Sequence, residues 1–366
     1  MKDRVTIGQL ALIYLLIIAG GKFIALPSLL AGDVGHDSWV SMCFSFLWDG
    51  ICLSFLLWAI KLNGKTKLDI AQILNKTVSK VVAKVIFGIF FVIFVLRINV
   101  LLTNCYQTFS ITFDVSTNWL VFMLPVAVLS FFAICRGFNA IARASQLLFA
   151  LIIISVVALL VPPLLEVEMS YLLPVGEAGW DKIVSTSFTR SFWFSDYIFF
   201  YFVMDSIKVK KRVFTPVFTA FFVGVVLTVL INAVFVALFG TFAPSFNIAM
   251  SKIGVFSASS AQNGRWDWLT LSVWLLSVVI KIIVFVFCAY KCVEKIFDKS
   301  FVKLNYFVAI FITLTFLLPM FVSTETLLST IIVWAMVPFC LVQYLLPLVM
   351  PLLTKIAIKK TEVKCE

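Results

Sequence analysis

Two glycines and a lysine interrupt the first apolar stretch of the chain at Gly20, Gly21 and Lys22, and Pro27 follows closely. Such a run is a natural place for a membrane helix to unwind. An unwound helix offers N–H groups that suit a carboxylate and C=O groups that suit a cation. We therefore predict an interrupted helix here, with a ligand-binding role for Ala19, Gly20, Gly21, Lys22 and Phe23. The structural alternative is a close helix crossing through small residues, with Lys22 extending to an interface.

A second polar run enters an apolar stretch at residues 185–196, where hydroxyl side chains, Arg190 and Asp196 precede an aromatic segment. Charges at such a depth are costly unless they face a cavity or a partner. Asp196 could hold a ligand ammonium group or a proton. It could also form a structural ion pair, with Arg190, Lys22 or Lys281 as the partner. The two roles can coexist, and the sequence leaves both open. Phe194, Ser195 and Asp196 are therefore candidate ligand-binding residues.

Other polar side chains also lie within apolar stretches. Arg97 and Asn104 are seven residues apart, which places them on one face of a helix. Asn104 is a further candidate for the ligand, whereas Lys281, Arg97 and Arg190 are candidates for charge coupling or ion pairing. For each of these side chains alone, a hydrogen bond between helices is the simpler interpretation.

The composition indicates that membrane helices position these side chains. Of 366 residues, 62% are hydrophobic and 13% are charged, and the mean hydropathy is +1.10. These values exclude a water-soluble enzyme, a disordered chain and a collagen-like one. Continuous apolar runs of about 20 residues also exclude a lipid-facing β-barrel. We predict an all-α polytopic membrane protein with ten spans, at approximately 6–30, 38–60, 85–111, 118–135, 144–164, 185–205, 214–241, 266–290, 304–322 and 328–353.

The basic residues predict the orientation of these spans. The net charge is +11, and most of the 29 Lys and Arg fall in the connections 61–84, 205–213 and 291–303 and in the C-terminal tail. Acidic residues gather instead in the intervening connections. By the positive-inside rule, both termini are expected in the cytoplasm. Because topology explains the basic excess, a nucleic-acid partner is not required.

We expect a single membrane domain over residues 1–366, because no connection between spans is long enough for a second domain. Polar disturbances in spans one and six of ten are typical of a five-plus-five inverted repeat. Repeat one would cover about 6–164 and repeat two about 185–353. With one histidine, and cysteines mostly in apolar spans, neither a metal site nor a disulfide framework is expected. No phosphate loop or nucleophile elbow is present, so we expect no cofactor and no catalytic residues.

Several segments together resemble the B subunit of spore germinant receptors, a permease-like family of the amino acid–polyamine–organocation superfamily. The order and spacing of these segments cover most of the chain. The matching segments are Ile7-Gly8-Gln9-Leu10 through Gly20-Gly21, Leu26-Pro27-Ser28-Leu29-Leu30-Ala31, Asp37-Ser38-Trp39-Val40, Arg136-Gly137-Phe138-Asn139-Ala140-Ile141-Ala142-Arg143, Leu172-Leu173-Pro174-Val175-Gly176-Glu177-Ala178-Gly179, and Gly264-Arg265-Trp266-Asp267 before Trp274.

The resemblance implies the LeuT-type fold, with discontinuous helices 1 and 6 around a site for a small germinant, commonly an amino acid. It also implies partners, namely a membrane A subunit and a lipoprotein C subunit in the inner membrane of the spore. Asp196 falls where the family usually has Glu, and Gly20-Gly21 fall at the break in span one. Span six differs from the family because it has no glycine or proline to loosen it.

Three functions follow from these observations. The first is a germinant-sensing subunit that binds an amino acid carboxylate near Gly21, Lys22 and Phe23, and its ammonium near Asp196 and the carbonyls of Ala19 and Phe194. The second is a proton-coupled amino acid permease in which Asp196 and a lysine exchange a proton. The third is a scaffold subunit with a degenerate ligand site, which the missing helix breaker in span six favours.

Overall fold

The computed structural model describes residues 5–64, 66–113, 118–208, 213–246, 248–260, 267–298, 305–321 and 332–362, which are almost entirely helical. The first half contains β1 (Val5–Thr6), α1 (Ile7–Ala19), α2 (Leu26–Val34), the 3₁₀ turn η1 (Gly35–Asp37), α3 (Ser38–Leu62), α4 (Ile70–Thr77), α5 (Lys80–Phe113), α6 (Trp119–Arg136), α7 (Phe138–Leu164) and η2 (Met169–Leu172). The second half contains α8 (Trp180–Thr189), η3 (Ser191–Trp193), η4 (Asp196–Phe199), α9 (Phe200–Val203), β2 (Ile207–Lys208), α10 (Phe214–Phe239), η5 (Gly240–Ser245), α11 (Ala249–Ser260), α12 (Asp267–Ile296), α13 (Asn305–Phe321), α15 (Ile332–Cys340), the π-helical turn η7 (Leu341–Leu345) and α16 (Leu346–Glu362).

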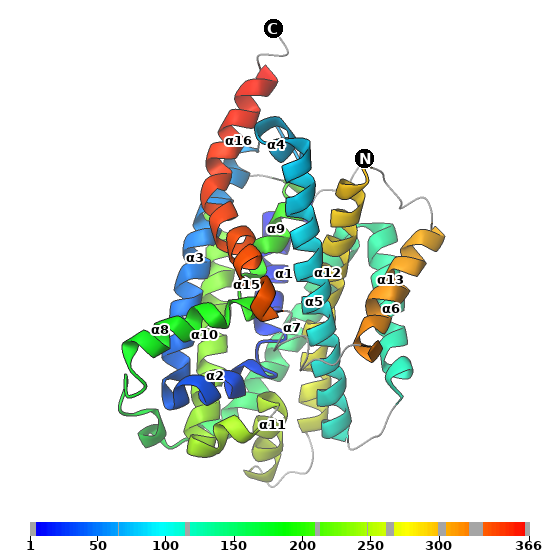
Figure 1. Ribbon diagram of the computed structural model, residues 1–366. Helices are drawn as coiled ribbons and strands as arrows, with labels where there is room; N and C mark the ends of the chain where they lie inside the picture. The colour runs from blue at the N-terminus through cyan, green and yellow to red at the C-terminus, as the bar shows by residue number, and fades with distance from the viewer. Residues whose placement is uncertain are drawn as a thin grey trace.

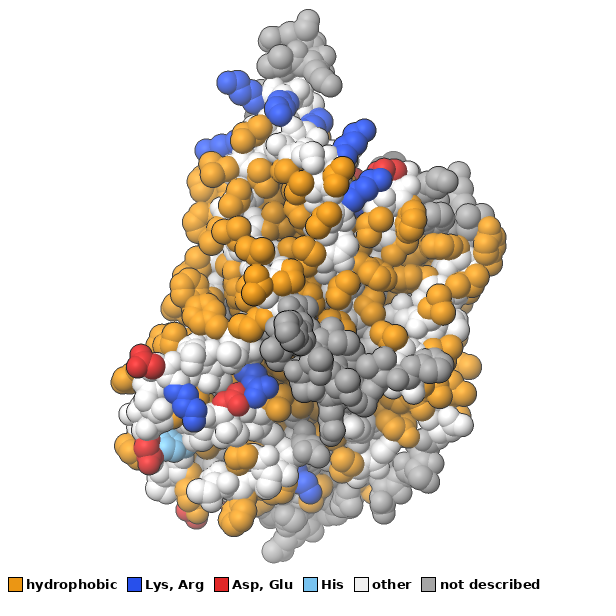
Figure 2. Space-filling view, in the orientation of Figure 1, with side chains coloured by type: hydrophobic (Ala, Val, Ile, Leu, Met, Phe, Trp, Pro, Cys, Tyr) orange, Lys and Arg blue, Asp and Glu red, His pale blue; other side chains and the backbone are white. Residues whose placement is uncertain are grey.

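Seven helices of the described part are long and apolar enough to cross a membrane. They comprise Leu26–Leu62, Lys80–Ile111, Trp119–Arg136, Phe138–Leu164, Phe214–Ser245, Trp268–Ile296 and Met336–Thr361. The face in Figure 2 is covered with hydrophobic side chains over most of the bundle, while lysine and arginine gather near the end of α16. The chain is therefore a multi-pass membrane protein.

The remaining three predicted spans are interrupted or short. The first divides into α1 and α2, and the sixth into α8, η3, η4 and α9. The ninth is represented by α13, with 17 residues. The tenth, predicted from 328, lies partly outside the described residues, and its helix extends to Glu362, beyond the predicted limit of 353. The seven long helices thus support seven of the ten predicted spans, and the total of ten stays a prediction.

Helix α12 lies inside the bundle, where it packs against α5, α7, α6 and α1. In its most apolar stretch 72% of the residues are buried, compared with 28% for α6 at the periphery (Figure 1). Elsewhere α1 packs against α10, and α16 against α3 and α4. The end of α16, α4 and the start of α5 lie together at one end of the bundle (Figure 1), and we call it the lysine-rich end because Lys76, Lys80, Lys84, Lys295 and Lys359 belong to it.

The interruption predicted at the two glycines is present. Helix α1 ends at Ala19, and Gly21 has a φ of 79°, in the left-handed region that glycine adopts without strain. A Cβ atom on Gly20 would lie 3.0 Å from the backbone C and O atoms of Ser277 on α12. The small residues therefore serve two purposes, since Gly21 allows the chain to turn and Gly20 allows α12 to approach.

The second interruption forms without a glycine or proline. After the 3₁₀ turn η3, Phe194 is extended and Ser195 adopts a left-handed conformation with a φ of 62°. A non-glycine residue in this region is uncommon and requires support from its surroundings. The absence of a helix breaker in span six therefore does not keep that span continuous.

Contacts join the first half of each interrupted helix to the second half of the other. At one end β1 pairs in parallel with β2, so that Val5 lies opposite Ile207. At the other end the guanidinium of Arg190, which follows α8, donates two hydrogen bonds to Asp33 of α2, at 2.6 and 2.8 Å. Helices α2 and α8 both lie across the bundle, whereas the long helices run along it (Figure 1).

Candidate functional site

Three buried cations surround one carboxylate between the two interruptions. Lys22 donates a hydrogen bond to Asp196, and Lys281 of α12 lies 3.0 Å from it. Arg97 of α5 completes the group, with its Nη1 atom 3.7 Å from Oδ1 of Asp196. All four side chains are at most 5% exposed. The cluster therefore joins both interrupted helices to α5 and α12.

A second carboxylate explains the conformation of Ser195. Asp49 of α3 accepts hydrogen bonds from the Ser195 N–H group at 2.8 Å and from its Oγ atom at 3.2 Å. Because Asp49 is only 2% exposed, these bonds form away from water and hold the left-handed turn in place. This turn presents Asp196, the next residue, to the three cations.

Counted formally, the site carries three positive charges, from Lys22, Lys281 and Arg97, and two negative charges, from Asp49 and Asp196. The difference is one positive charge in a region with little access to water. An unbalanced charge at this depth is costly. The site therefore favours an additional anion.

A cavity of about 20 Å³ adjoins this cluster. Its polar lining comes from Gly21, Arg97, Asp196 and Lys281. An aromatic wall faces them, formed by Phe192, Trp193 and Phe285. This volume accommodates about one water molecule. The structure therefore corresponds to a closed site.

Several hydrogen-bond donors beside the cavity are unused within the described part of the chain. The Nε and Nη1 atoms of Arg97 have no hydrogen-bond partner, although Nη2 donates to the Phe194 carbonyl. The N–H group of Gly21 also lacks an acceptor among the described residues. Nε and Nη1 lie on different edges of the guanidinium, so each can donate a separate charge-assisted hydrogen bond to an anion such as a carboxylate. The arrangement can therefore receive a carboxylate.

The structure brings together Gly21, Lys22, Asp196, Lys281 and Arg97 from the predicted set. The ion pair between Asp196 and lysine, which the sequence left open, is present twice. Their role in binding a ligand stays a prediction.

Protein donors already occupy the carbonyl groups predicted to bind an ammonium. The Ala19 carbonyl accepts a hydrogen bond from Nε1 of Trp274 at 3.3 Å. The Gly20 carbonyl lies 3.4 Å from Nζ of Lys281, and the Phe194 carbonyl accepts from Arg97. A ligand ammonium would therefore share one of these carbonyls with a protein donor, displace that donor, or bind to Asp196 alone.

The two aromatic candidates pack around the cluster. Phe23 stacks on Trp274 with ring centroids 6.1 Å apart. The ring of Phe194 lies against Phe46, and the Nζ atom of Lys22 is 5.6 Å from each of these two ring centroids. The rings of Phe46 and Phe194 thus lie beside the Lys22 ammonium, which donates to Asp196.

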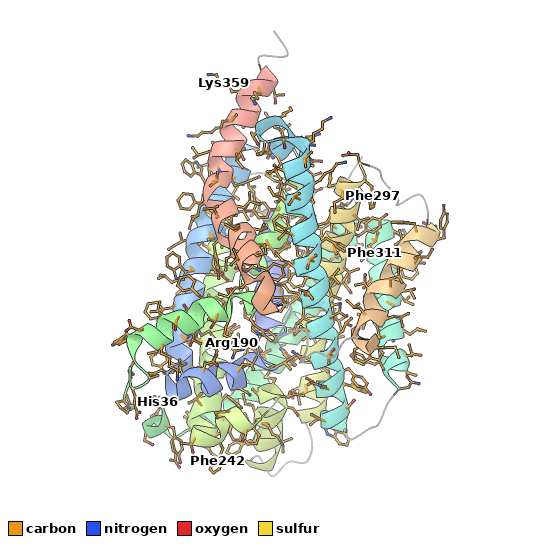
Figure 3. The ribbon with its side chains drawn as sticks, viewed as in Figure 1. His36, Arg190, Phe242, Phe297, Phe311 and Lys359 are labelled. Atoms are coloured by element: carbon orange, nitrogen blue, oxygen red, sulfur yellow. The ribbon has the colours of Figure 1, made fainter. Side chains whose placement is uncertain are left out.

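Two candidates lie elsewhere. Arg190 pairs with Asp33 of α2 and not with Asp196. Figure 3 shows the place of Arg190 in the bundle. Asn104 is buried on α5 but does not line the cavity. Neither is placed to contact a ligand in this conformation.

Sequence reasoning gave no role to Asp49 or to the aromatic wall. Two signals could have indicated the wall, since Phe192 and Trp193 lie within the polar run of span six and Phe285 follows Lys281 by one helical turn. Among the described residues, no group of His, Cys, Asp and Glu is arranged to hold a metal ion.

Comparison with known proteins supplies the family. A family model described as spore germination protein matches residues 4–328. The chain belongs to this family. The matched region spans nearly the whole chain, and it includes both interrupted helices and every residue of the charged cluster. No curated protein gives a significant match.

Solved transporter structures are similar to this spore germination protein in fold. Mhp1, a nucleobase-cation-symport-1 family transporter in a closed conformation with bromovinylhydantoin bound, aligns with a TM-score of 0.59 and 12% identity, over 89% of this chain and 75% of that chain. A mutant manganese transporter from Eremococcus coleocola aligns with a TM-score of 0.49 and 11% identity, over 97% and 78% of the two chains. At 12% identity the first alignment supports the fold alone. Family and fold are thus those of permeases and transporters.

Proposed function

We propose that this chain is the germinant-sensing membrane subunit of a spore germination receptor, and that it binds a small amino acid or a similar nutrient. Family membership and a transporter-like fold support this proposal. We further propose ten spans in a LeuT-type five-plus-five repeat, about 6–164 and 185–353, in one domain over 1–366. In this proposal both termini are cytoplasmic, and the A and C receptor subunits are partners in the spore inner membrane.

The observation that carries the proposal is the set of free donors beside an unbalanced positive charge. Arg97 lines the cavity, and its Nε and Nη1 atoms have no hydrogen-bond partner among the described residues. The N–H group of Gly21, which also lines the cavity, has no acceptor among these residues either. A ligand carboxylate would accept these bonds and balance the formal charge. The ammonium group of an amino acid would then pair with Asp196.

Binding requires the site to open. A cavity of about 20 Å³ is too small for any amino acid, and the lysines already occupy the Asp196 carboxylate. The ammonium of the ligand would therefore replace Lys22 or Lys281 on Asp196. This exchange supplies a signal, because Lys22 belongs to the first interruption and Asp196 to the second.

The test is the thermal stability of the purified protein in detergent against amino acids, nucleosides and sugars. A ligand that binds the folded state alone at about 100 times its Kd adds about 2.7 kcal/mol of stability. For an amino acid that gives a shift, the matching amine and the matching carboxylic acid are the ligand controls. We expect the acid to retain part of the shift and the amine to lose it.

The matched variants are Arg97→Lys, which keeps the charge but removes the guanidinium donors, and Arg190→Lys, which makes the same change outside the cavity. We expect the ligand shift to disappear in the first and to persist in the second. A shift that survives Arg97→Lys unchanged would refute the carboxylate assignment.

Two alternatives share the same site. The sharing of Asp196 by two lysines favours a proton-coupled amino acid permease, because a proton could move when one lysine leaves. The small cavity, and the pairing of Asp196 with the protein's own lysines, favour a scaffold with a degenerate site. Proteoliposomes with a pH gradient separate the three: a permease accumulates the amino acid, a sensor binds it without accumulation, and a scaffold does neither.

A further inference from the structure

A second pocket, of about 110 Å³, lies at the lysine-rich end. Lys80 and Lys84 line it from the first turns of α5, and Lys295 and Asp298 from the end of α12. Asn75 of α4 contributes an amide. Its residues on α5 and α12 lie ten or more positions from Arg97 and Lys281 of the charged cluster, and it has room for several water molecules.

The charges of this pocket are incompletely balanced. Lys84 pairs with Asp298 at 2.8 Å, and Lys295 pairs with Asp69 at 2.5 Å. The side chain of Lys80 forms no ion pair or hydrogen bond with any residue that the structure describes. Three lysines and two carboxylates leave one formal positive charge, and the N-terminus of the long helix α5 adds a partial one.

Asp298 already acts as an internal anion here. The hydrogen bond from Lys84, and the charges of Lys84, Lys80 and Lys295, hold the pKa of Asp298 below its ordinary value. The side chain is 66% exposed and that of Lys84 is 44% exposed. Exposed ion pairs of this kind contribute little to stability, so Lys84 can exchange Asp298 for another anion at little cost.

Exposed apolar side chains follow or precede the lining residues of the pocket in the sequence. Val81 and Val85 alternate with the two lysines at the start of α5 and are 72% and 57% exposed. Phe297, beside Asp298, is 60% exposed and lies at the outer end of α12 (Figure 3). Both α5 and α12 belong to the helices long and apolar enough to cross a membrane. Basic groups above an exposed apolar surface at a helix end match a phospholipid, whose phosphate lies above its acyl chains.

We propose that this pocket binds a phosphate group, and that the headgroup of an anionic phospholipid supplies it. The phosphate contacts Lys80 and Lys84, while the acyl chains lie along Val81 and Val85. The inference rests on the geometry of this pocket and on the membrane-spanning helices, and it is independent of the proposed germinant site.

The experiment compares the full chain in nanodiscs of phosphatidylcholine alone and of phosphatidylcholine with phosphatidylglycerol. Native mass spectrometry measures retained phosphatidylglycerol, and thermal unfolding measures stabilisation. The test variant is Lys80→Gln, which breaks no ion pair and therefore leaves the fold intact. The matched control is Lys359→Gln, an exposed lysine on α16 at the same end that does not line the pocket (Figure 3).

We expect phosphatidylglycerol to be retained and to stabilise the protein, with retention falling about fivefold in Lys80→Gln and remaining unchanged in Lys359→Gln. Inorganic phosphate added in detergent distinguishes the source. No thermal shift with phosphate supports a lipid headgroup, whereas an equal shift that Lys80→Gln removes identifies a soluble phosphate as the ligand and overturns the lipid assignment. Equal losses in both variants, or no retention in the unaltered protein, would overturn the site itself.

Discussion

The ion cluster around Asp196 predicts a compensation between charges. Replacing Asp196 by Asn keeps the shape of the side chain and removes its charge, so that three buried cations face Asp49 alone. The Lys281 and Arg97 nitrogens lie 3.0 and 3.7 Å from the carboxylate. At an effective dielectric constant of about 20, each attraction amounts to about 5 kcal/mol before the cost of removing water. Removing one partner of such a buried group costs about 3–5 kcal/mol in measured cases.

We therefore expect Asp196→Asn to lower the free energy of unfolding by about 3–5 kcal/mol. Lys281→Met alone should cost less, because it leaves two cations and two carboxylates. The double variant should recover part of the loss, since it returns the formal charge to that of the unaltered site. Denaturant unfolding in detergent, followed by intrinsic tryptophan fluorescence, measures all three.

Asp33→Asn is the matched control. It removes an equally well-bonded carboxylate, but Asp33 and Arg190 are 28% and 31% exposed, so the loss should be at most about 1 kcal/mol. If the two single changes at the cluster are additive in the double variant, the side chains are not coupled and the reasoning fails. Equal costs for Asp196→Asn and Asp33→Asn would also contradict it.

Two further predictions concern backbone positions. Gly21→Ala should destabilise the fold by more than about 1 kcal/mol, because φ is positive and the new Cβ would lie 2.5 Å from Leu101. Gly8→Ala in α1, whose Cβ meets no atom within 4 Å, should be neutral to slightly stabilising in the same unfolding measurement. Equal behaviour of the two alanines would count against the turn. Asp37→Asn removes an acceptor that holds the 174–178 segment through two N–H groups, at 2.7 and 3.0 Å, so amide hydrogen exchange there should accelerate about tenfold or more. Unchanged exchange would mean that other contacts hold this segment.

The interrupted helices show what the sequence could and could not predict. Gly20 and Gly21 indicate the first interruption directly, because their conformational freedom is a property of the residues themselves. The polar run near Asp196 indicates a disturbance in span six but not its form. Serine adopts a positive φ only with support, and that support comes from Asp49, which is remote in the sequence.

The composition of the charged cluster was more predictable than its geometry. Buried charges need partners, so Lys22, Lys281 and Asp196 are natural candidates for one another. Arg190 is nearer to Asp196 in sequence, but the chain turns between them and Arg190 meets Asp33 instead. Asn104 shares a face with Arg97 yet lies about 10 Å farther along the helix, beyond the small cavity. Periodicity gives the face of a helix, whereas the depth of a site depends on tertiary packing.

The pairing of the half-helices has a mechanical consequence. The strand pairing of Val5–Thr6 with Ile207–Lys208 joins α1 to the segment after α9. The ion pair between Asp33 and Arg190 joins α2 to α8. We therefore expect each joined pair of half-helices to move as one unit. The points of flexure are Gly21 and Ser195, the positive-φ residues of the two interruptions, and Asp196 directly follows Ser195. A molecule that separates Lys22 from Asp196 would act at the two interruptions, where a small displacement produces a larger one at the outer ends of the half-helices.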